Sequence, residues 1–389
     1  MGYQKKLGEL LRKERESLDL TLVEVSKKLN FNHYQTLSSI EVGEREIKAW
    51  ELAKLAEIYG RDIYYFLNLE ESREKGRILW NSPEESTQKS LLERQFLLIC
   101  QRYQKLIDLL GENESNYASL KFKIDKHELL SKYAFKYVED MAINYSHILN
   151  LGSRPAFSLC KTLEGTMAIK VIFLPMASDI SQGCTVDPKF GMAALINENN
   201  APWRRSFDLC REFFHLLTWD LFSEEEIYQN QKIGESSQVE KLAEFFAMAL
   251  LLPEKELRDE FERLIDDDKY VSYLELVHIT RDFIVPLEAL LIRLRNLGLL
   301  DKEKVQEDLE NGNIQDFDKK YRHSQWAETA KPHLSARYIS LAIKAFLSGK
   351  ITRETLADYV DESSSTIPAF LRRYGYDENE DYSDSYHII

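Results

Sequence analysis

The order of three segments between residues 191 and 253 constrains the fold of this 389-residue chain most strongly. Gly191 to Asn197 alternates like a short β-strand and ends in a polar turn. Residues 207–215 (Phe-Asp-Leu-Cys-Arg-Glu-Phe-Phe-His) follow as a helix, and Val239 to Leu252 forms a second, apolar helix that Pro253 stops. A strand and two helices in this order predict a domain that mixes α and β structure.

The first of these helices carries Arg211, Glu212 and His215. In the H-E-x-x-H motif, two histidines at positions i and i+4 share one helix face and hold zinc, and the Glu between them activates a water molecule. Here the first histidine position holds Arg211, whose guanidinium has no lone pair to offer and repels a divalent cation. The segment therefore indicates the framework of a zinc site without its full ligand set.

The order of a strand, a helix of the form R-x-x-F-x-x-A-H-E-x-x-H and a helix of the form E-x-x-A-N-x-F-A-A-x-L-L-M-P resembles the ImmA/IrrE family of zinc-dependent peptidases. The resemblance covers roughly residues 130 to 260. It implies a zincin-like domain with Glu212 at the catalytic position, His215 and Glu240 at the second and third zinc-ligand positions, and Arg211 replacing the first ligand. Since a catalytic zinc needs three protein ligands, we expect no cofactor, with zinc bound only if the site is retained.

The chain departs from the family at further positions near the expected metal site. Glu244 stands where the family has Asn, and Phe213-Phe214 stand where it has Leu-Gly. A buried Glu240 without a counter-charge is costly, so we predict that Arg211 forms an ion pair with Glu240, with Glu212 considered as a third member. The alternative is that Arg211 turns to solvent and the pocket is wet or filled by the two phenylalanine rings.

The first 70 residues carry a second helical pattern. Tyr3 to Leu18 is amphipathic, and Thr21 with Glu24 predicts a capping box at the start of a helix over Leu22 to Leu29. His33 to Val42 closes on Gly43, and Trp50 to Tyr59 is a further amphipathic helix. Two short helices around a tight turn within such a set predict a helix-turn-helix bundle.

The run Gln35 to Arg45 (Gln-Thr-Leu-Ser-Ser-Ile-Glu-Val-Gly-Glu-Arg) resembles the I-S-x-I-E-x-G-x-R signature of the XRE, lambda-repressor-like, family over residues 5 to 68. The resemblance implies a five-helix bundle whose second motif helix enters the major groove of double-stranded DNA. The alternative use of this fold is protein contact. The residues expected to contact DNA are Asn32, His33, Tyr34, Gln35, Thr36, Ser38, Ser39 and Arg45, with Gln35 suited to adenine.

The charge and the hydropathy of the chain limit which partners and which cellular compartment we expect for it. The net charge is −14, of which residues 1–70 contribute −1 and the remaining 319 residues −13. The acidic remainder lowers the non-specific affinity for DNA, so we expect that dimerisation is needed to reach a useful affinity. No window approaches a membrane-spanning run, and the N-terminus lacks the apolar core of a signal peptide. Together with four widely spaced cysteines, these features predict a cytoplasmic protein without a membrane partner.

We therefore predict a mainly α (α+β) chain of several parts. An N-terminal five-helix bundle and an α+β domain with a small sheet precede a helical C-terminal region, in which Thr352 caps a helix. Other expected elements are a polar linker at residues 69–88, helices at Leu91 to Leu110, Glu128 to Leu149 and Val285 to Leu297, and a strand at Met167 to Phe173. The predicted boundaries are 1–70 (DNA-binding domain), 71–125 (helical linker), 126–260 (peptidase-like domain), 261–373 (C-terminal helical region) and 374–389 (acidic tail).

Three functions are open at this point. The first is a homodimeric, sequence-specific transcriptional regulator whose ImmA/IrrE-like domain has lost zinc and peptidase activity and serves as a sensing, dimerising or partner-binding module. The second is an active metallopeptidase that acts on a repressor or another partner protein. The third is an antitoxin or a regulator of a defence system. Arg211 argues against the enzyme, so we expect a pseudoenzyme; the sequence names neither the DNA target nor a protein or small-molecule effector.

Overall fold

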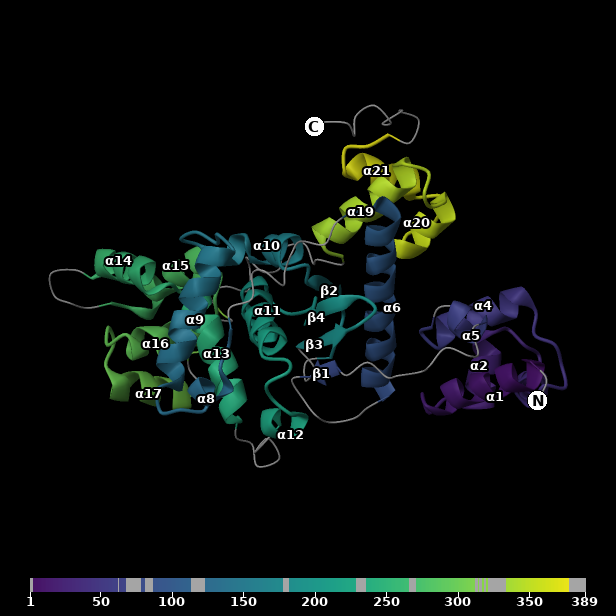
Figure 1. Ribbon diagram of the computed structural model, residues 1–389, viewed down its shortest axis with the longest axis horizontal. Coiled ribbons are helices and arrows are strands. Elements are labelled where there is room, and N and C mark those ends of the chain that lie inside the picture. Colours follow the sequence, from purple (N-terminus) through teal and green to yellow (C-terminus); the bar gives the residue numbers. More distant parts are fainter. Residues whose placement is uncertain are drawn as a thin grey trace. The chain divides into compact units, whose positions relative to one another are not determined.

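The computed structural model describes most of the chain, in two compact units (Figure 1). Unit 1 consists of Met1–Gly76 and Pro83–Arg102, and unit 2 of Arg77–Ser82 and Tyr103–Ile389. The described residues are 3–61, 63–67, 78–80, 87–112, 123–177, 182–228, 236–265, 271–311, 314, 317, 320 and 334–377.

Unit 1 is the predicted bundle of five short helices, joined by the first part of a longer helix. The predicted capping box is confirmed, because Thr21 accepts from the backbone N–H of Glu24 and the Glu24 side chain accepts from that of Thr21. The predicted helix end at Gly43 is also confirmed, with a left-handed φ of 82° that favours glycine. The helices are α1 (Tyr3–Glu16), α2 (Leu22–Lys28), α3 (Tyr34–Val42), α4 (Ala49–Ile58), α5 (Ile63–Leu67) and α6 (Thr87–Leu110).

A buried ion pair ties α1 to α3 inside this bundle. Arg15 Nε donates to Glu41 Oε1 over 2.7 Å, and Arg15 Nη2 donates to Glu41 Oε2 over 3.0 Å. Arg15 Nη1 donates to the carbonyl oxygen of Leu20 in the turn that leads to α2. Around this pair, apolar side chains such as Leu11 and Leu37 are fully buried. The arrangement fixes α3 against the scaffold and leaves its other face outward.

Unit 2 is built on a four-stranded sheet with the order β1-β3-β4-β2. β2 runs parallel to β4, whereas β1 and β4 both pair antiparallel with β3. β4 matches its prediction. β2 begins three residues later than expected, and β3 was not predicted. The strands are β1 (Ile78–Trp80), β2 (Lys170–Leu174), β3 (Gln182–Asp187) and β4 (Gly191–Asn197).

The interpretation of residues 69–88 as a polar linker was wrong for their apolar part, because Ile78–Trp80 is a strand of the sheet. The Asn81-Ser82-Pro83 sequence that follows this strand lies outside the described residues.

Helices cover the sheet in successive layers, as Figure 1 shows for α11, α13 and α9. α11 (Pro202–Leu217) contacts β3 and β4, and α13 (Gln238–Leu251) packs between α11 and α9 (Ala134–Ile148). Phe213, Phe214 and Phe246 pack ring against ring at this interface. The expected helix over Glu128 to Leu149 is divided, since α8 (Lys126–Leu129) ends before α9 begins.

The rest of unit 2 is helical, as predicted. Thr352 is the N-cap of α20, and its hydroxyl accepts from the backbone N–H of Thr355. Most of the predicted acidic tail, residues 378–389, lies outside the described residues. The remaining elements are η1 (Pro155–Phe157), α10 (Leu159–Thr166), α12 (Glu224–Ile227), α14 (Glu254–Leu264), α15 (Tyr273–Phe283), α16 (Leu287–Asn296), α17 (Lys302–Glu310), α19 (Ala336–Leu347), α20 (Arg353–Tyr359) and α21 (Ile367–Arg373).

Candidate functional site

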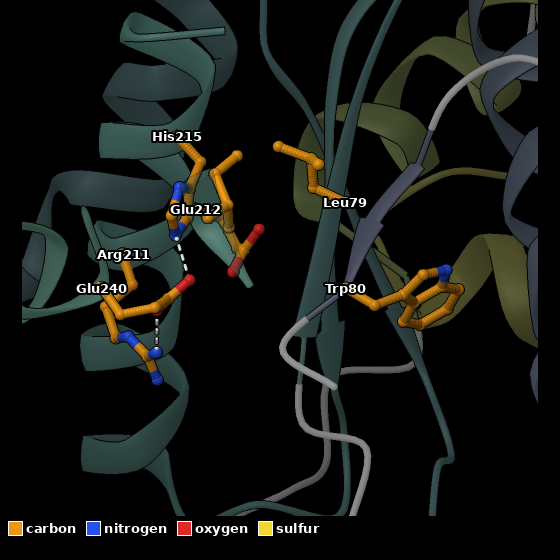
Figure 2. Close-up of a pocket in the computed structure, with 7 residues that line it drawn as sticks. Leu79, Trp80, Arg211, Glu212, His215 and Glu240 are labelled. Atoms are coloured by element: carbon orange, nitrogen blue, oxygen red, sulfur yellow. Dashed lines mark hydrogen bonds and ion pairs between the residues drawn. The ribbon is translucent and has the colours of Figure 1, made fainter. Parts of the chain in front are cut away.

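A bridge between α11 and α13 joins three of the residues singled out from the sequence (Figure 2). Arg211 Nη2 donates to Glu240 Oε2 over 2.6 Å, and His215 Nε2 lies 3.2 Å from Glu240 Oε1. The side chains of Arg211 and Glu240 are 12% and 6% exposed, so Arg211 does not turn to solvent. The predicted ion pair between Arg211 and Glu240 is therefore confirmed.

The local sequence places Glu240 for this role. Ser237 caps α13, and its hydroxyl accepts from the backbone N–H of Glu240, which lies in the first turn. A carboxylate in the first turn is also favoured by the helix dipole. On α11, Arg211 and His215 are one turn apart and share a face. These two local arrangements direct one carboxylate toward two nitrogen groups.

The electrostatics of the bridge follow from its burial and its charges. Burial disfavours a charged Glu240, but His215 and Arg211 outweigh that cost and lower the pKa of Glu240 to about 2. Burial likewise disfavours a protonated His215, but Glu240 outweighs it and raises the pKa of His215. The bridge therefore holds an ionised Glu240 between a guanidinium and an imidazole that favours its proton.

Glu212 stands apart from the bridge, because the hydrogen bond and ion pairs that form it join Arg211, His215 and Glu240. Its participation as a third member is therefore not supported. It accepts a hydrogen bond from the thiol of Cys184 on β3. Burial raises the pKa of Glu212 to about 7, although His215 and the Cys184 thiol favour the carboxylate. Phe213 and Phe214 are fully buried in the core and do not line this pocket.

These residues do not fit a catalytic zinc. The nitrogen of His215 that faces the site, Nε2, already contacts Glu240, and the guanidinium of Arg211 lies against the other carboxylate oxygen. A zinc-binding histidine normally donates its second ring N–H to an acceptor, whereas within the described residues Nδ1 of His215 is buried without a hydrogen-bond partner. No group of three or more His, Cys, Asp or Glu suited to a metal occurs in the described parts of the chain.

A second candidate site is the outer face of α3 in unit 1. The predicted DNA-contacting residues Asn32, His33, Tyr34 and Gln35 are exposed at the start of the helix. Thr36, Ser38 and Ser39 are half-buried along it. His33 is the N-cap residue, and its side chain makes no capping hydrogen bond. The structure therefore brings these residues together on one surface.

Arg45 is placed differently from the other predicted contacts. Its Nη1 and Nη2 donate to the two carboxylate oxygens of Glu51 over 2.9 and 2.8 Å, and its guanidinium lies over the ring of Phe31. Its contact with DNA stays a prediction, but a phosphate would have to compete with Glu51. Two other basic residues of unit 1, Lys27 and Lys28 in the last turn of α2, are exposed.

Several residues of both sites were not foreseen. Leu79 and Trp80 of β1 line the pocket beside Glu212 and His215, and Cys184 donates to Glu212. In the sequence, β1 is indicated by a short apolar run within a polar stretch, and such a run alone is a weak signal for a strand. In unit 1, Trp50 is 54% exposed and its ring stands edge-on to that of Phe31, in the turn before α3.

Two family models match parts of this chain. Residues 11–66 match the family model described as helix-turn-helix, and residues 165–295 match the one described as IrrE N-terminal-like domain. A solved structure, a Mycobacterium tuberculosis transcriptional regulator, is 16% identical with a TM-score of 0.27, and the match spans 49% of this chain and 51% of that one. No curated protein matches.

The fold and the two family matches thus define a chain that joins a helix-turn-helix region to an IrrE N-terminal-like region. Both resemblances indicated by the sequence motifs are confirmed. In addition, none of the described helices is both long and apolar enough to cross a membrane.

Proposed function

We propose that this protein is a sequence-specific, DNA-binding transcriptional regulator. The observation that carries the proposal is the exposed start of α3, residues 32–35, in a bundle that matches the helix-turn-helix family. In this fold the early residues of the second motif helix read base edges in the major groove, while neighbouring side chains hold phosphates. We further propose that it acts in the cytoplasm as a homodimer on a near-palindromic site. The modest charge of unit 1 limits the affinity of one copy for DNA, and two copies double the contact surface.

In such a regulator the IrrE-like region has a structural and binding role rather than a peptidase role. The bridge of Arg211, Glu240 and His215 supports this assignment, because the groups that would hold zinc bind one another. Without a metal, Glu212 has no activated water to deprotonate. We infer that zinc binding and catalysis were lost together and that the domain now binds a partner.

Gln35→Ala is expected to relax the preference for one base pair more than it lowers overall affinity. A bidentate contact from Gln to adenine is worth about 1–3 kcal/mol of discrimination. Selection from random duplexes, followed by titration of the enriched site and its single-base variants, measures this. Gln101→Ala, the same change at an exposed position of α6, is the control and should bind like the unchanged protein. If no site is enriched with the unchanged protein, the regulator proposal is wrong.

Protein purified without added metal is expected to contain far less than one zinc per chain. Arg211→His should raise zinc content, because it restores a first ligand beside His215 and Glu240. Metal analysis by mass spectrometry measures both, with Arg211→Gln as a control that removes the guanidinium without adding a ligand. Stoichiometric zinc in the unchanged protein that is lost in His215→Ala would contradict the proposal.

A further inference from the structure

The strand β1 has an unusual place in the chain. Residues 1–76 and 83–102 belong to unit 1, yet the short stretch Arg77–Ser82 between them belongs to unit 2. Within unit 2, β1 pairs antiparallel with β3 at the edge of the sheet, and without it β3 would be the edge strand. A segment that leaves the DNA-binding unit thus adds itself to the sheet of the IrrE-like region. Adding an extended segment to a sheet edge is a common mode of peptide recognition.

Two side chains and one backbone N–H group of β1 make close contacts in unit 2. Leu79 pairs with Cys184 and Trp80 with Gly183, and these two side chains of β1 are 3% and 4% exposed. The backbone N–H of Trp80 donates to the hydroxyl of Tyr228 over 2.9 Å. Leu79 and Trp80 point to opposite faces of the sheet, and Leu79 points toward Glu212 and His215 (Figure 2). β1 therefore covers the pocket that contains the bridge.

Gly183 shapes the surface that receives β1. A Cβ atom at this position would lie 2.9 Å from the carbonyl oxygen of Leu79 and 3.2 Å from the ring of Trp80. The close approach of the Trp80 ring to the backbone of β3 thus depends on a residue without a side chain. The groove that fits the side chains of Leu79 and Trp80 is formed by the pocket beside Glu212, by Gly183 and by the hydroxyl of Tyr228.

We propose that the edge of β3, with Gly183, Tyr228 and the pocket beside Glu212, is a binding groove for an extended apolar peptide, and that residues 78–80 occupy it in cis. The ligand class is a peptide strand with a Leu-sized side chain on one face and an aromatic ring on the other. Such a peptide would be the partner of the IrrE-like region, and this assignment rests on the proposed function. A cis segment has an effective concentration on the order of millimolar, so a second peptide binds measurably only when β1 is weakened.

The test uses a labelled peptide with the sequence of residues 76–82, Gly-Arg-Ile-Leu-Trp-Asn-Ser, added to the full-length protein. The double variant Leu79→Ser/Trp80→Ser keeps Gly183 and empties the groove, so it should bind the peptide at least ~10-fold more tightly than the unchanged protein does. Adding Gly183→Ala to the double variant should remove that gain. Gly165→Ala is the matched control, because a Cβ at Gly165 on α10 meets no atom within 4 Å.

Hydrogen exchange gives an independent measurement on the single variant Gly183→Ala. Amides of residues 78–80 should exchange at least ~10-fold faster than in the unchanged protein, while α11 and α13 stay protected. Equal peptide affinity of the unchanged and emptied proteins, or unchanged exchange at β1 in Gly183→Ala, would overturn the proposal. Loss of protection throughout α11 and α13 in the emptied variant would also overturn it, because β1 would then be an integral part of the core. No DNA enters these measurements, so they succeed or fail separately from the regulator proposal.

Discussion

Arg211→Met is expected to lower the free energy of unfolding of unit 2 by about 3–5 kcal/mol at neutral pH, the usual cost of breaking a buried ion pair from one side. The reason is that Glu240, 6% exposed, keeps its charge beside His215 but loses the guanidinium that lies 2.6 Å away. Methionine fills much the same volume as arginine, so the packing of α11 against α13 changes little. Urea denaturation followed by a probe of unit 2 measures the difference.

Two further variants separate charge from packing in this experiment. Arg211→Met/Glu240→Leu leaves no stranded carboxylate in the bridge and should recover most of the lost stability, as replacements of buried ion pairs by apolar groups often do. Lys136→Met breaks an exposed pair with Asp140 on α9 and should leave the free energy of unfolding unchanged. A single variant Arg211→Met as stable as the unchanged protein would show that the bridge is not a structural replacement for zinc.

Arg15→Met is the second change with a large expected effect, and it concerns unit 1. It strands Glu41, 4% exposed, and removes the hydrogen bond to the carbonyl oxygen of Leu20, so we expect a loss of about 3–5 kcal/mol. Since this pair ties α1 to α3, specific DNA binding should fall in parallel with the folded fraction of unit 1. Hydrogen exchange in α1 and α3, together with DNA titration, measures both.

Arg12→Met is the matched control for this prediction. Arg12 lies on the same helix one turn earlier and pairs with Glu16, but both side chains are more than half exposed. Exposed pairs contribute little because water and salt screen them, so stability and DNA binding should stay unchanged. If Arg12→Met and Arg15→Met had equal effects, the buried position of the Arg15–Glu41 pair would not explain its importance.

The helices of unit 1 were predictable because their signals are local. The Thr21 and Glu24 capping box acts over three residues, and Gly43 ends its helix through its own backbone conformation. The apolar positions repeat with the helical period, so their burial followed from the sequence as well. The placement of Arg45 against Glu51 did not follow, because the two residues are six apart on either side of a turn.

The bridge was predictable only through the resemblance. Arg211 and Glu240 are 29 residues apart, and no periodicity connects them, but the family pattern places both at ligand positions facing one space. The partner of Glu212 was not predictable in this way. Cys184 belongs to β3, a strand that carries no clear alternation and was therefore missed.

The sequence by itself determined the two folds of this protein, the presence of Arg211 where the resemblance implies a zinc ligand, and the face of α3 that is exposed. These depend on short-range spacing and on the chemistry of single side chains, which a sequence contains in full. Only the tertiary structure decided that residues 78–80 become a strand over the bridge and that Gly183 makes room for Trp80. A three-residue apolar run has no period of its own, so its structure depends on the β3 edge, which is more than 100 residues away in the chain.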